Sequence, residues 1–434
     1  METTKKSYAL PIAMMFALFF MIAFVTGLQN PMGVIIKSQF GASNFVSQLG
    51  NLANFIAYAF MGIPAGLLLS KIGYKKTALT AIAVGFIGVG VTYLSGLLGT
   101  NEAGAASNNT GIFAVYLIGA LISGFSMCML NTVVNPMLNS LGGGGNKGNQ
   151  LIQFGGSCNS IGATIVPVLV GYLIGDVSQA SISDATPALF IAMGIFALAF
   201  IVLGSMQIPE PYIAKNDTKE KTSDKYSAWS FRHFILGVIA IFIYVGVEVG
   251  IPNIANLFMT DELGIATSEA GTIVGTYWFL MLIGRLIGGA VGARVSSKTM
   301  LATVATIGIV FVLAAMFLPL STKVMMPVFK SDISFGTVEV PICIMCFVLC
   351  GLCTSVMWGG IFNLAVEGLG KYTAAASGIF MMMVCGGGIL PAIQGWIADM
   401  AGFLNSFWLI FAGMFYFLFY ALVGSKNVNK NIPV

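Results

Sequence analysis

The stretch GLLLSKIGYKK (residues 66–76) follows an apolar run and is repeated in outline by GAVGARVSSKT at residues 289–299. In both stretches a glycine is followed five residues later by a basic residue, which sets Lys71 against Arg294 at an offset of 223. A second landmark has nearly the same spacing. Pro167 and Pro391 each begin a P-x-x-x-G pattern, at an offset of 224. The two offsets indicate a duplicated chain, and internal repeats of this kind are typical of secondary transporters.

The composition places both halves in a membrane. Of the 434 residues, 57% are hydrophobic and only 8% are charged, whereas soluble domains contain about 25% charged residues. The 53 glycines suit close helix–helix packing in lipid. The net charge of +4 is small, and no basic patch indicates a nucleic-acid partner. We therefore predict a multi-pass membrane protein whose surroundings are the lipid bilayer.

Twelve apolar runs are long enough to span a bilayer, which requires about 20 residues of helix. The fold class predicted is an all-α integral membrane protein with twelve transmembrane helices in two pseudo-symmetric six-helix bundles. We expect an N-terminal bundle at 1–206, a cytoplasmic linker at 207–230 and a C-terminal bundle at 231–434. Polar loops are expected around 99–110 and 320–338. The predicted spans are 9–37, 44–69, 77–98, 111–140, 150–175, 185–206, 231–258, 268–292, 299–319, 339–366, 372–400 and 403–424.

The loop charges predict the orientation. With the N-terminus inside, 16 of the 20 Lys and Arg residues fall on the inner side, and only Lys37, Lys323 and Lys330 fall outside. The remaining one, Arg285, lies within a span. Because cytoplasmic loops are enriched in Lys and Arg, both termini are predicted to be cytoplasmic.

The stretch at 66–76 resembles the signature loop of the major facilitator superfamily, although Ser70 occupies the position where that loop usually has an aspartate. Other segments resemble the bacterial fucose permease branch, whose members take up fucose, glucose, galactose and related sugars. The resemblance implies import of a neutral monosaccharide by alternating access, in cation-coupled symport, across the cytoplasmic (inner) membrane of a bacterium. No cofactor is expected, and we expect the functional unit to be a monomer. The segments are FVTGLQNPMG (24–33), PAGLLLSKIGYKK (64–76), LNTVVNP (130–136), CNSIGATIVP (158–167), YVGVEVG (244–250), LIGRLIGG (282–289) and GGGILPAIQGWIAD (386–399).

Two positions depart from what the resemblance implies. The fucose permease branch has an acidic residue in helix one and another in helix four, and these serve sugar binding and proton coupling. This chain has Asn30 and Asn131 there. An amide does not exchange a proton near neutral pH. The coupling ion is therefore left open between H+, Na+ and none.

Ionisable side chains deep in a span are costly and usually serve a pathway or pair with a partner. Glu248 and Arg285 are the two that fall near mid-depth. Glu248 is predicted to accept sugar hydroxyls or to couple a cation; a structural carboxylate satisfied by nearby amides is the alternative. Arg285 is predicted to be a structural and gating residue. At 1.5 Å per residue the two differ in depth by roughly 10 Å, so a direct pair requires Arg285 to reach or the helices to shift.

Amides complete the predicted sugar site, because an amide both donates to and accepts from hydroxyl groups. Asn131, Asn135 and Asn139 recur every four residues and form one stripe on a helix. Aromatic rings would pack against the C–H faces of a sugar. Other polar side chains expected in the cavity include Tyr58, Asn256, Tyr277, Gln394 and Trp396. The predicted substrate-binding set is Gln29, Asn30, Asn54, Asn131, Asn135, Gln153, Asn159, Glu248, Asn253, Trp278, Trp358 and Asn363.

A second set is predicted to be structural or to participate in gating. Gly284, Gly288 and Gly292 recur every four residues and should allow another helix to approach. Gly142–Gly145 are expected to form a cytoplasmic turn rather than a phosphate-binding loop, because no Ser or Thr follows Lys147. The gating and structural set is Gly66, Lys71, Gly73, Lys75, Lys76, Arg285 and Arg294.

Several alternatives remain open. The substrate could be another neutral solute, such as an amino sugar, a cell-wall sugar or a drug, or the protein could be an uncoupled sugar uniporter. A membrane enzyme is disfavoured because no nucleophile, base or metal cluster gathers at one membrane face. The four cysteines in the run 341–353, PICIMCFVLCGLC, align along a helix and are interpreted as small packing residues rather than as metal ligands.

Overall fold

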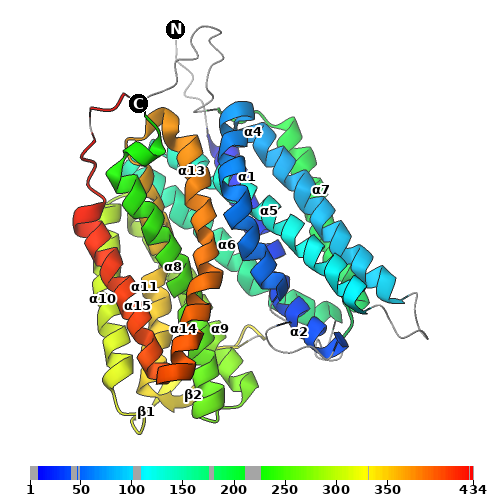
Figure 1. Cartoon of the computed structure of the whole chain (residues 1–434), viewed down its shortest axis with the longest axis vertical. Coiled ribbons are helices and arrows are strands. Elements are labelled where there is room, and N and C mark those ends of the chain that lie inside the picture. The colour runs from blue at the N-terminus through cyan, green and yellow to red at the C-terminus, as the bar shows by residue number, and fades with distance from the viewer. Residues whose placement is uncertain are drawn as a thin grey trace. The chain divides into compact units, whose positions relative to one another are not determined.

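The computed structural model of the chain describes residues 8–40, 46, 49–100, 109–174, 180–210, 226–330, 332–429 and 431–433. Helices dominate this part of the chain, and one short β-hairpin accompanies them (Figure 1). Ten of the described helical segments are long and apolar enough to cross a membrane.

All twelve predicted spans correspond to helices. The helix α4 (Leu49–Thr100) is 52 residues long and contains two spans joined at Gly73, where φ is 84°. A positive φ of this size favours glycine, which has no Cβ. The 30-residue helix α6 (Gly145–Ile174) supplies a further span. The predicted twelve-helix, all-α membrane architecture is confirmed.

The chain divides into two compact units. Unit 1 comprises Met1–Lys221 with Thr373–Met381, and unit 2 comprises Thr222–Tyr372 with Met382–Val434. The predicted boundaries at 206 and 231 remain predictions, because most of the proposed linker, residues 211–225, lies outside the described residues.

Unit 1 is a helical bundle built around α4. This helix packs mainly on α5 and α7, and α1 packs on α6. Thr373–Met381, which belong to α13 (Thr373–Met382), also group with this unit. A Cβ placed on Gly66 would lie 3.0 Å from the Cα of Gly378, so α4 and α13 are in backbone contact. The other elements are α1 (Ala9–Gly27), α2 (Gln29–Phe40), α5 (Asn109–Leu141), η2 (Ile182–Ala185) and α7 (Thr186–Ser205).

The turn between α5 and α6 has the predicted glycine geometry. Gly143, Gly144 and Gly145 have φ values of 76°, 72° and 54°, all in the left-handed region. The amide of Gly144 donates to the carbonyl of Asn139 over 2.9 Å and so helps to end α5. The Asn131–Asn135–Asn139 stripe therefore lies on the last turns of a helix that ends at a glycine turn, as expected.

Two groups of packed helices make up most of unit 2. The helix α8 packs on α12 and α14, while α11 packs on α9 and α10. A π-helical turn, η4 (Phe258–Glu262), extends α8 beyond the predicted end at residue 258. The main helices are α8 (Arg232–Leu257), α9 (Thr267–Gly292), α10 (Ser297–Phe317), α11 (Ile342–Ser355), α12 (Met357–Val366), α14 (Gly386–Ala401) and α15 (Phe403–Phe419). Short turns are η3 (Ala228–Ser230), η5 (Gly370–Tyr372), η6 (Met383–Cys385) and η7 (Tyr420–Gly424).

The loop predicted at 320–338 is instead a β-hairpin. Strands β1 (Lys323–Phe329) and β2 (Phe335–Pro341) pair antiparallel, with Lys323 opposite Pro341 and Phe329 opposite Phe335. The following helix therefore begins at Ile342 and not at residue 339. The hairpin is fixed to α9, because Phe329 stacks on Phe279 with ring centroids 4.4 Å apart and its amide donates to Thr276.

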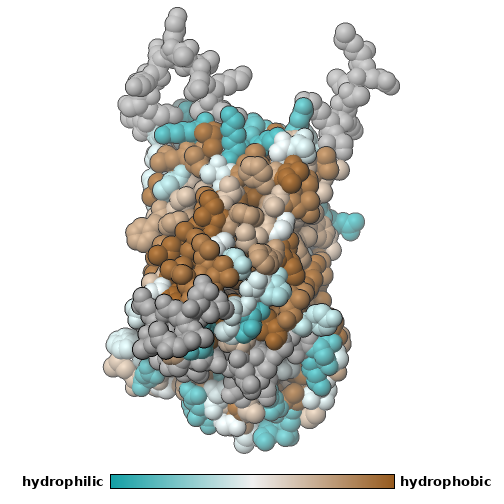
Figure 2. Space-filling view, turned by 90° about the vertical axis from the view of Figure 1, so that its right-hand side faces the viewer, coloured by the Kyte–Doolittle hydropathy of each residue, from teal (hydrophilic) through white to brown (hydrophobic). Residues whose placement is uncertain are grey.

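The described surface is that of a membrane protein. Figure 2 shows a broad band of hydrophobic side chains on one face, with hydrophilic side chains gathered at both ends. Large apolar side chains are well exposed, including Phe60, Leu198 and Ile201. Exposed apolar surface of this extent is stable against lipid rather than water.

Candidate functional site

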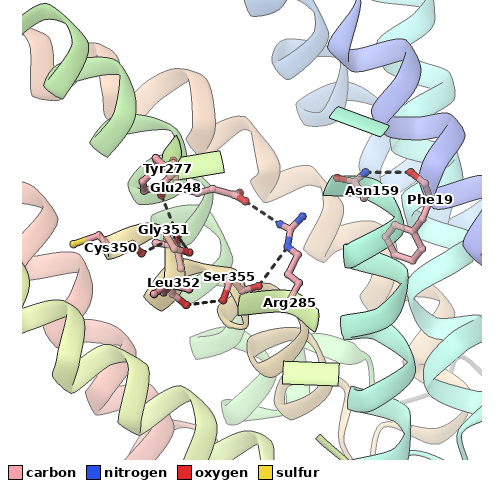
Figure 3. Close-up of polar contacts among 10 residues, drawn as sticks. Phe19, Asn159, Glu248, Tyr277, Arg285, Cys350, Gly351, Leu352 and Ser355 are labelled. Carbon is pink, nitrogen blue, oxygen red and sulfur yellow. Dashed lines mark hydrogen bonds and ion pairs between the residues drawn. The ribbon is translucent and has the colours of Figure 1, made fainter. Parts of the chain in front are cut away.

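The strongest polar feature of unit 2 is an ion pair between two helices. Nη2 of Arg285 on α9 lies 3.1 Å from Oε1 of Glu248 on α8, and Figure 3 shows the two side chains pointing toward each other. Their side chains are only 11% and 14% exposed, respectively. The predicted depth difference is thus bridged by the long arginine side chain. Each charge neutralises the other in surroundings where a lone charge is costly.

Helix α11 holds Arg285 from the other side. Nε of Arg285 faces the backbone carbonyl of Ser355 at 3.4 Å. The predicted glycine stripe makes this approach possible: a Cβ on Gly284 would collide with the Ser355 side chain, and one on Gly288 would collide with Val356. Arg285 is therefore positioned by a close α9–α11 contact as well as by its carboxylate partner.

A hydroxyl pair braces the backbone beside the carboxylate. The Tyr277 hydroxyl donates to the carbonyl oxygen of Glu248 over 3.1 Å and lies 3.0 Å from the hydroxyl of Thr354 on α11. Both side chains are buried. The network joins α8, α9 and α11, and so fixes the helix that carries Glu248 relative to the helix that carries Arg285.

Tyr244, Thr354 and Ser355 are residues of this site that the sequence reasoning did not single out. Tyr244 lies one turn before Glu248 on α8 and is fully buried. Its ring packs near Trp358, with centroids 6.2 Å apart. Its hydroxyl approaches Glu248 without forming a well-aligned hydrogen bond within the described residues. The four-residue spacing to Glu248 in YVGVEVG was the available signal.

In unit 1 the asparagine stripe forms a second polar cluster. Nδ2 of Asn131 lies 3.0 Å from the Tyr58 hydroxyl of α4 and 3.2 Å from the carbonyl of Met127. Nδ2 of Asn135 donates to the Asn131 carbonyl over 2.9 Å. The distance from Nδ2 of Asn135 to the side-chain oxygen of Asn131 is 3.5 Å, which is long for a hydrogen bond. This oxygen can therefore accept a further hydrogen bond.

Three more predicted amides occur in unit 1, in different settings. Asn54 of α4 is 6% exposed, and its Oδ1 has no partner within the described residues. Gln153 is buried, with Nε2 3.4 Å from Oδ1 of Asn149. Nδ2 of Asn159 donates to the carbonyl of Phe19 over 3.2 Å, a bond from α6 to α1 (Figure 3). Asn159 is thus an interhelical brace in this structure.

Other residues of the predicted substrate-binding set contact groups other than the Glu248 carboxylate, are exposed, or lie outside the described side chains. Nδ2 of Asn363 donates to the Ser297 hydroxyl over 2.8 Å and joins α12 to the start of α10. Asn253 is exposed, and Trp278 is 37% exposed and packs edge-on against Tyr277. The side chains of Gln29 and Asn30 lie outside the described residues. The roles of all these residues in binding remain predictions.

The predicted gating loop is contacted by an acid from beyond the end of α7, Glu210, which the sequence reasoning missed. Glu210 accepts hydrogen bonds from the backbone amides of Tyr74 at 2.6 Å and Lys75 at 3.0 Å, where α4 resumes after Gly73. Nζ of Lys75 donates to the carbonyls at the end of α7, Gly204 and Met206. The side chains of Lys71, Lys76 and Arg294 are exposed.

The side chains that this arrangement brings together can bind a polar solute by hydrogen bonds. Within the described residues, no group of three His, Cys, Asp or Glu side chains could hold a metal ion. The four cysteines of α11 are free and buried in its helix contacts. What the helices offer is a neutralised ion pair, several amides and aromatic rings near them.

Comparison with known proteins identifies the sequence family. Residues 15–390 match the sequence profile of the Major Facilitator Superfamily. A glucose/galactose transporter of Brucella abortus is 29% identical over 98% of this chain and 96% of its own length. An L-fucose-proton symporter of Escherichia coli is 24% identical over 92% of this chain and 89% of its own.

Solved structures show the same fold. FucP, a Major Facilitator Superfamily transporter in the outward conformation, has a TM-score of 0.80 at 20% identity, covering 97% of this chain and 100% of that one. The proton:xylose symporter XylE, bound to 6-bromo-6-deoxy-D-glucose, has a TM-score of 0.71 at 14% identity, covering 97% of each chain.

Proposed function

Because the chain belongs to the Major Facilitator Superfamily, we propose that it is a secondary active transporter that imports a neutral monosaccharide by alternating access. The sugar is of the glucose, galactose or fucose class. The relatives named glucose/galactose transporter support this class, since they align with the chain over nearly its full length. The chain acts as a transporter and not as an enzyme.

The Glu248–Arg285 pair is the observation that carries the neutral-substrate proposal. An anionic substrate requires an unpaired basic group in its site. Arg285, the basic residue near mid-span, is already paired with a carboxylate at 3.1 Å. The helices that carry the pair thus offer no net charge, while the amides and hydroxyls nearby suit the hydroxyl groups of a sugar. The Tyr244–Trp358 pair offers the aromatic surface that the C–H faces of a sugar require.

Glu248 is the residue that we assign to coupling. Asn30 and Asn131 carry amides, so Glu248 is the carboxylate left near mid-span to take up a cation. A proton on Glu248 would remove its negative charge and break the ion pair with Arg285, which changes the link between α8 and α9. The relative named L-fucose-proton symporter favours H+. Sodium uses the same carboxylate oxygens and is the rival outcome.

The loop charges support the proposed orientation in the cytoplasmic membrane of a bacterium, with both termini inside. The chain is proposed to work as a monomer, because each copy contains both halves of the duplication. Neither nucleic acid nor a cofactor has a role in this proposal.

Uptake by purified protein in liposomes tests the function. We expect radiolabelled glucose, galactose or fucose to accumulate when a proton gradient is imposed, and Glu248→Gln to abolish that accumulation. Glu262→Gln, at an exposed carboxylate of η4, is the matched control and should accumulate sugar normally. Accumulation driven only by a sodium gradient would mean that the coupling ion is Na+ and not H+. Equilibration without accumulation would indicate a uniporter.

Failure to take up any of the three sugars under either gradient contradicts the proposed substrate class. The remaining candidates would then be amino sugars, cell-wall sugars and neutral drugs. Competition by a panel of these solutes in the same liposomes distinguishes among them.

A further inference from the structure

A pocket in unit 2 lies outside the Glu248 cluster. It has a volume of about 170 Å³ and is enclosed by α8, α14 and α15. Its walls are almost wholly apolar: Ile243 and Val247 come from α8, Leu390 from α14, and Leu409 and Ile410 from α15. Three closely packed glycines, Gly246, Gly250 and Gly413, let these helices approach around it.

Two side chains with polar groups line this pocket, and the hydroxyl of one of them, Tyr416, already donates to the carbonyl of Leu236 over 3.0 Å. Gln394 of α14 is fully buried, and both its Nε2 and its Oε1 lack a hydrogen-bond partner within the described residues. The amide lies over Gly250, where an added Cβ would be 2.5 Å from Oε1. Buried polar groups in native proteins are nearly always paired, and each exception needs an explanation such as a bound molecule.

The pocket lies on a different face of α8 from the proposed sugar site. Gly246 and Gly250 are each two residues from Glu248, which places them about 160° around the helix at roughly 100° per residue. Gln394 therefore does not belong with the amides around Glu248, contrary to the expectation from sequence that it adds to the same cavity. Ala412, on the rim, is exposed, as are the nearby apolar side chains of Ile389, Ile393 and Phe415. A ligand would reach this rim from the lipid phase.

The size and chemistry of the pocket define its occupant. A cavity of about 150 Å³ accommodates one benzene molecule, so this pocket fits a single ring with a small substituent. Bound water is a poor occupant, because a buried water needs two to four polar partners. Apart from the Tyr416 hydroxyl, whose hydrogen is used on Leu236, the pocket offers a single amide. A carboxamide or a protonated carboxylic acid suits that amide. Its carbonyl oxygen accepts a hydrogen bond from Nε2, and its N–H or O–H group donates one to Oε1.

We propose that the α8–α14–α15 pocket is a second binding site, which takes a small neutral amphiphile from the membrane. The ring of the ligand fills the apolar pocket, and its adjacent hydrogen-bond donor and acceptor pair with the Gln394 amide. The occupant is a membrane-dissolved aromatic amide or acid, and it binds independently of the sugar.

Ligand-observed NMR on the full chain in nanodiscs tests the proposal, with benzamide as the probe. Isopropylbenzene is the control ligand, because it has the same number of heavy atoms as benzamide and a similar shape but cannot form hydrogen bonds. Empty nanodiscs give the non-specific partition of each ligand. We expect saturable binding of benzamide to the native protein, and at least tenfold weaker binding to Gln394→Met, which keeps the side-chain volume but removes the amide.

Ala412→Phe should fill the pocket from its rim and abolish saturable binding of benzamide. Ala197→Phe, at an exposed alanine of α7, is the matched control and should leave benzamide binding unchanged. Thermal unfolding of each variant confirms that it is folded. Absence of saturable benzamide binding to the native protein would overturn the proposal. Equal benzamide affinity in the native protein and in Gln394→Met would overturn it as well.

Discussion

Arg285 on α9 donates to the carboxylate of Glu248 on α8 across 3.1 Å, and its Nε faces the Ser355 carbonyl of α11. The pair thus joins three helices of unit 2 through one guanidinium. A solvent-exposed ion pair contributes little to stability, because water solvates each charge well. The side chains of Arg285 and Glu248 are only 11% and 14% exposed, so water cannot replace the partner of either charge. The contact on which the stability of unit 2 depends is therefore the same one that the proposed coupling would break during transport.

Removal of one partner should be more damaging than removal of both. Arg285→Met leaves the Glu248 carboxylate buried without its counter-ion, and we expect it to lower the free energy of unfolding by about 3 kcal/mol. The double variant Glu248→Gln/Arg285→Met should recover a large part of that loss, because no charge remains. Unfolding by SDS titration in mixed micelles measures both.

The exposed pair between Lys323 and Glu339 on the hairpin is the natural control. These side chains are 3.7 Å apart but 56% and 60% exposed, so Lys323→Met should cost less than about 1 kcal/mol. A double variant no more stable than Arg285→Met alone would contradict the idea that the unpaired charge causes the damage.

The sequence was enough to predict the helices of this site but not the contacts between them. The twelve spans, the stripe at Asn131 and Asn135, and the glycines beside Arg285 all follow from periodicity and composition. Whether Arg285 reaches Glu248 depends on how α8 and α9 shift along each other. That shift is set by packing between distant segments, which no local pattern contains.

Other features had weak or misleading signals. The hairpin at Lys323–Pro341 has the sequence features of a loop, because polar residues and Pro327 interrupt its strand pattern. Tyr244 and Glu210 went unnoticed because a single tyrosine or glutamate has many ordinary roles. The bond from Asn363 to Ser297, 66 residues away in the chain, could not be predicted from residue type, and sugar binding by Asn363 stays a prediction.

Close packing of α9 on α11 should make substitution of Gly284 damaging, as it should at Gly288. Gly284→Ala places a methyl group against Ser355, and we expect it to lower the melting temperature and the sugar uptake together. Gly271 lies on the same helix with nothing within 4 Å of its Cβ position. Gly271→Ala should therefore be neutral, or stabilising by up to about 1 kcal/mol. Equal melting temperatures for the two variants would count against the packing argument.

Glu210 should stabilise the restart of α4 after Gly73. Its carboxylate accepts from two backbone amides at the start of this helical segment, where free N–H groups favour a negative charge. Glu210→Ala should lower the free energy of unfolding by about 1 to 2 kcal/mol, in the range of a lost helix cap. Glu262→Ala, at an exposed carboxylate without these contacts, serves as the control and should leave the SDS unfolding midpoint unchanged.

Asn131 and Asn363 should respond differently to the same substitution. Asn131 retains an oxygen able to accept from a sugar hydroxyl, so Asn131→Ala should raise the KM for uptake about fivefold, as expected for loss of one neutral hydrogen bond of about 1 kcal/mol. Asn363→Ala should leave KM unchanged but lower stability by about 0.6 to 1.7 kcal/mol, the range for interhelical hydrogen bonds in membranes. If Asn363→Ala raised KM as much as Asn131→Ala, the assignment of Asn363 as a brace would be wrong.

Substitutions at two tyrosines can distinguish sugar binding from structural stabilisation in the Glu248 cluster. The Tyr277 hydroxyl bonds to the Glu248 carbonyl and to Thr354, so Tyr277→Phe should lower the melting temperature because buried partners lose their bonds. The Tyr244 hydroxyl has no well-aligned partner within the described residues, so Tyr244→Phe should leave the melting temperature unchanged or raise it.

If the Tyr244 hydroxyl instead bonds to the sugar, Tyr244→Phe should raise the KM for uptake about fivefold, which again corresponds to about 1 kcal/mol. Uptake in liposomes and thermal unfolding in detergent measure the two effects on the same preparations. An unchanged KM would exclude Tyr244 from the sugar site and leave its ring, packed on Trp358, as a purely structural element. A raised KM at unchanged stability requires a contact that forms only when the substrate is bound, because no bond present in the unbound protein has been removed.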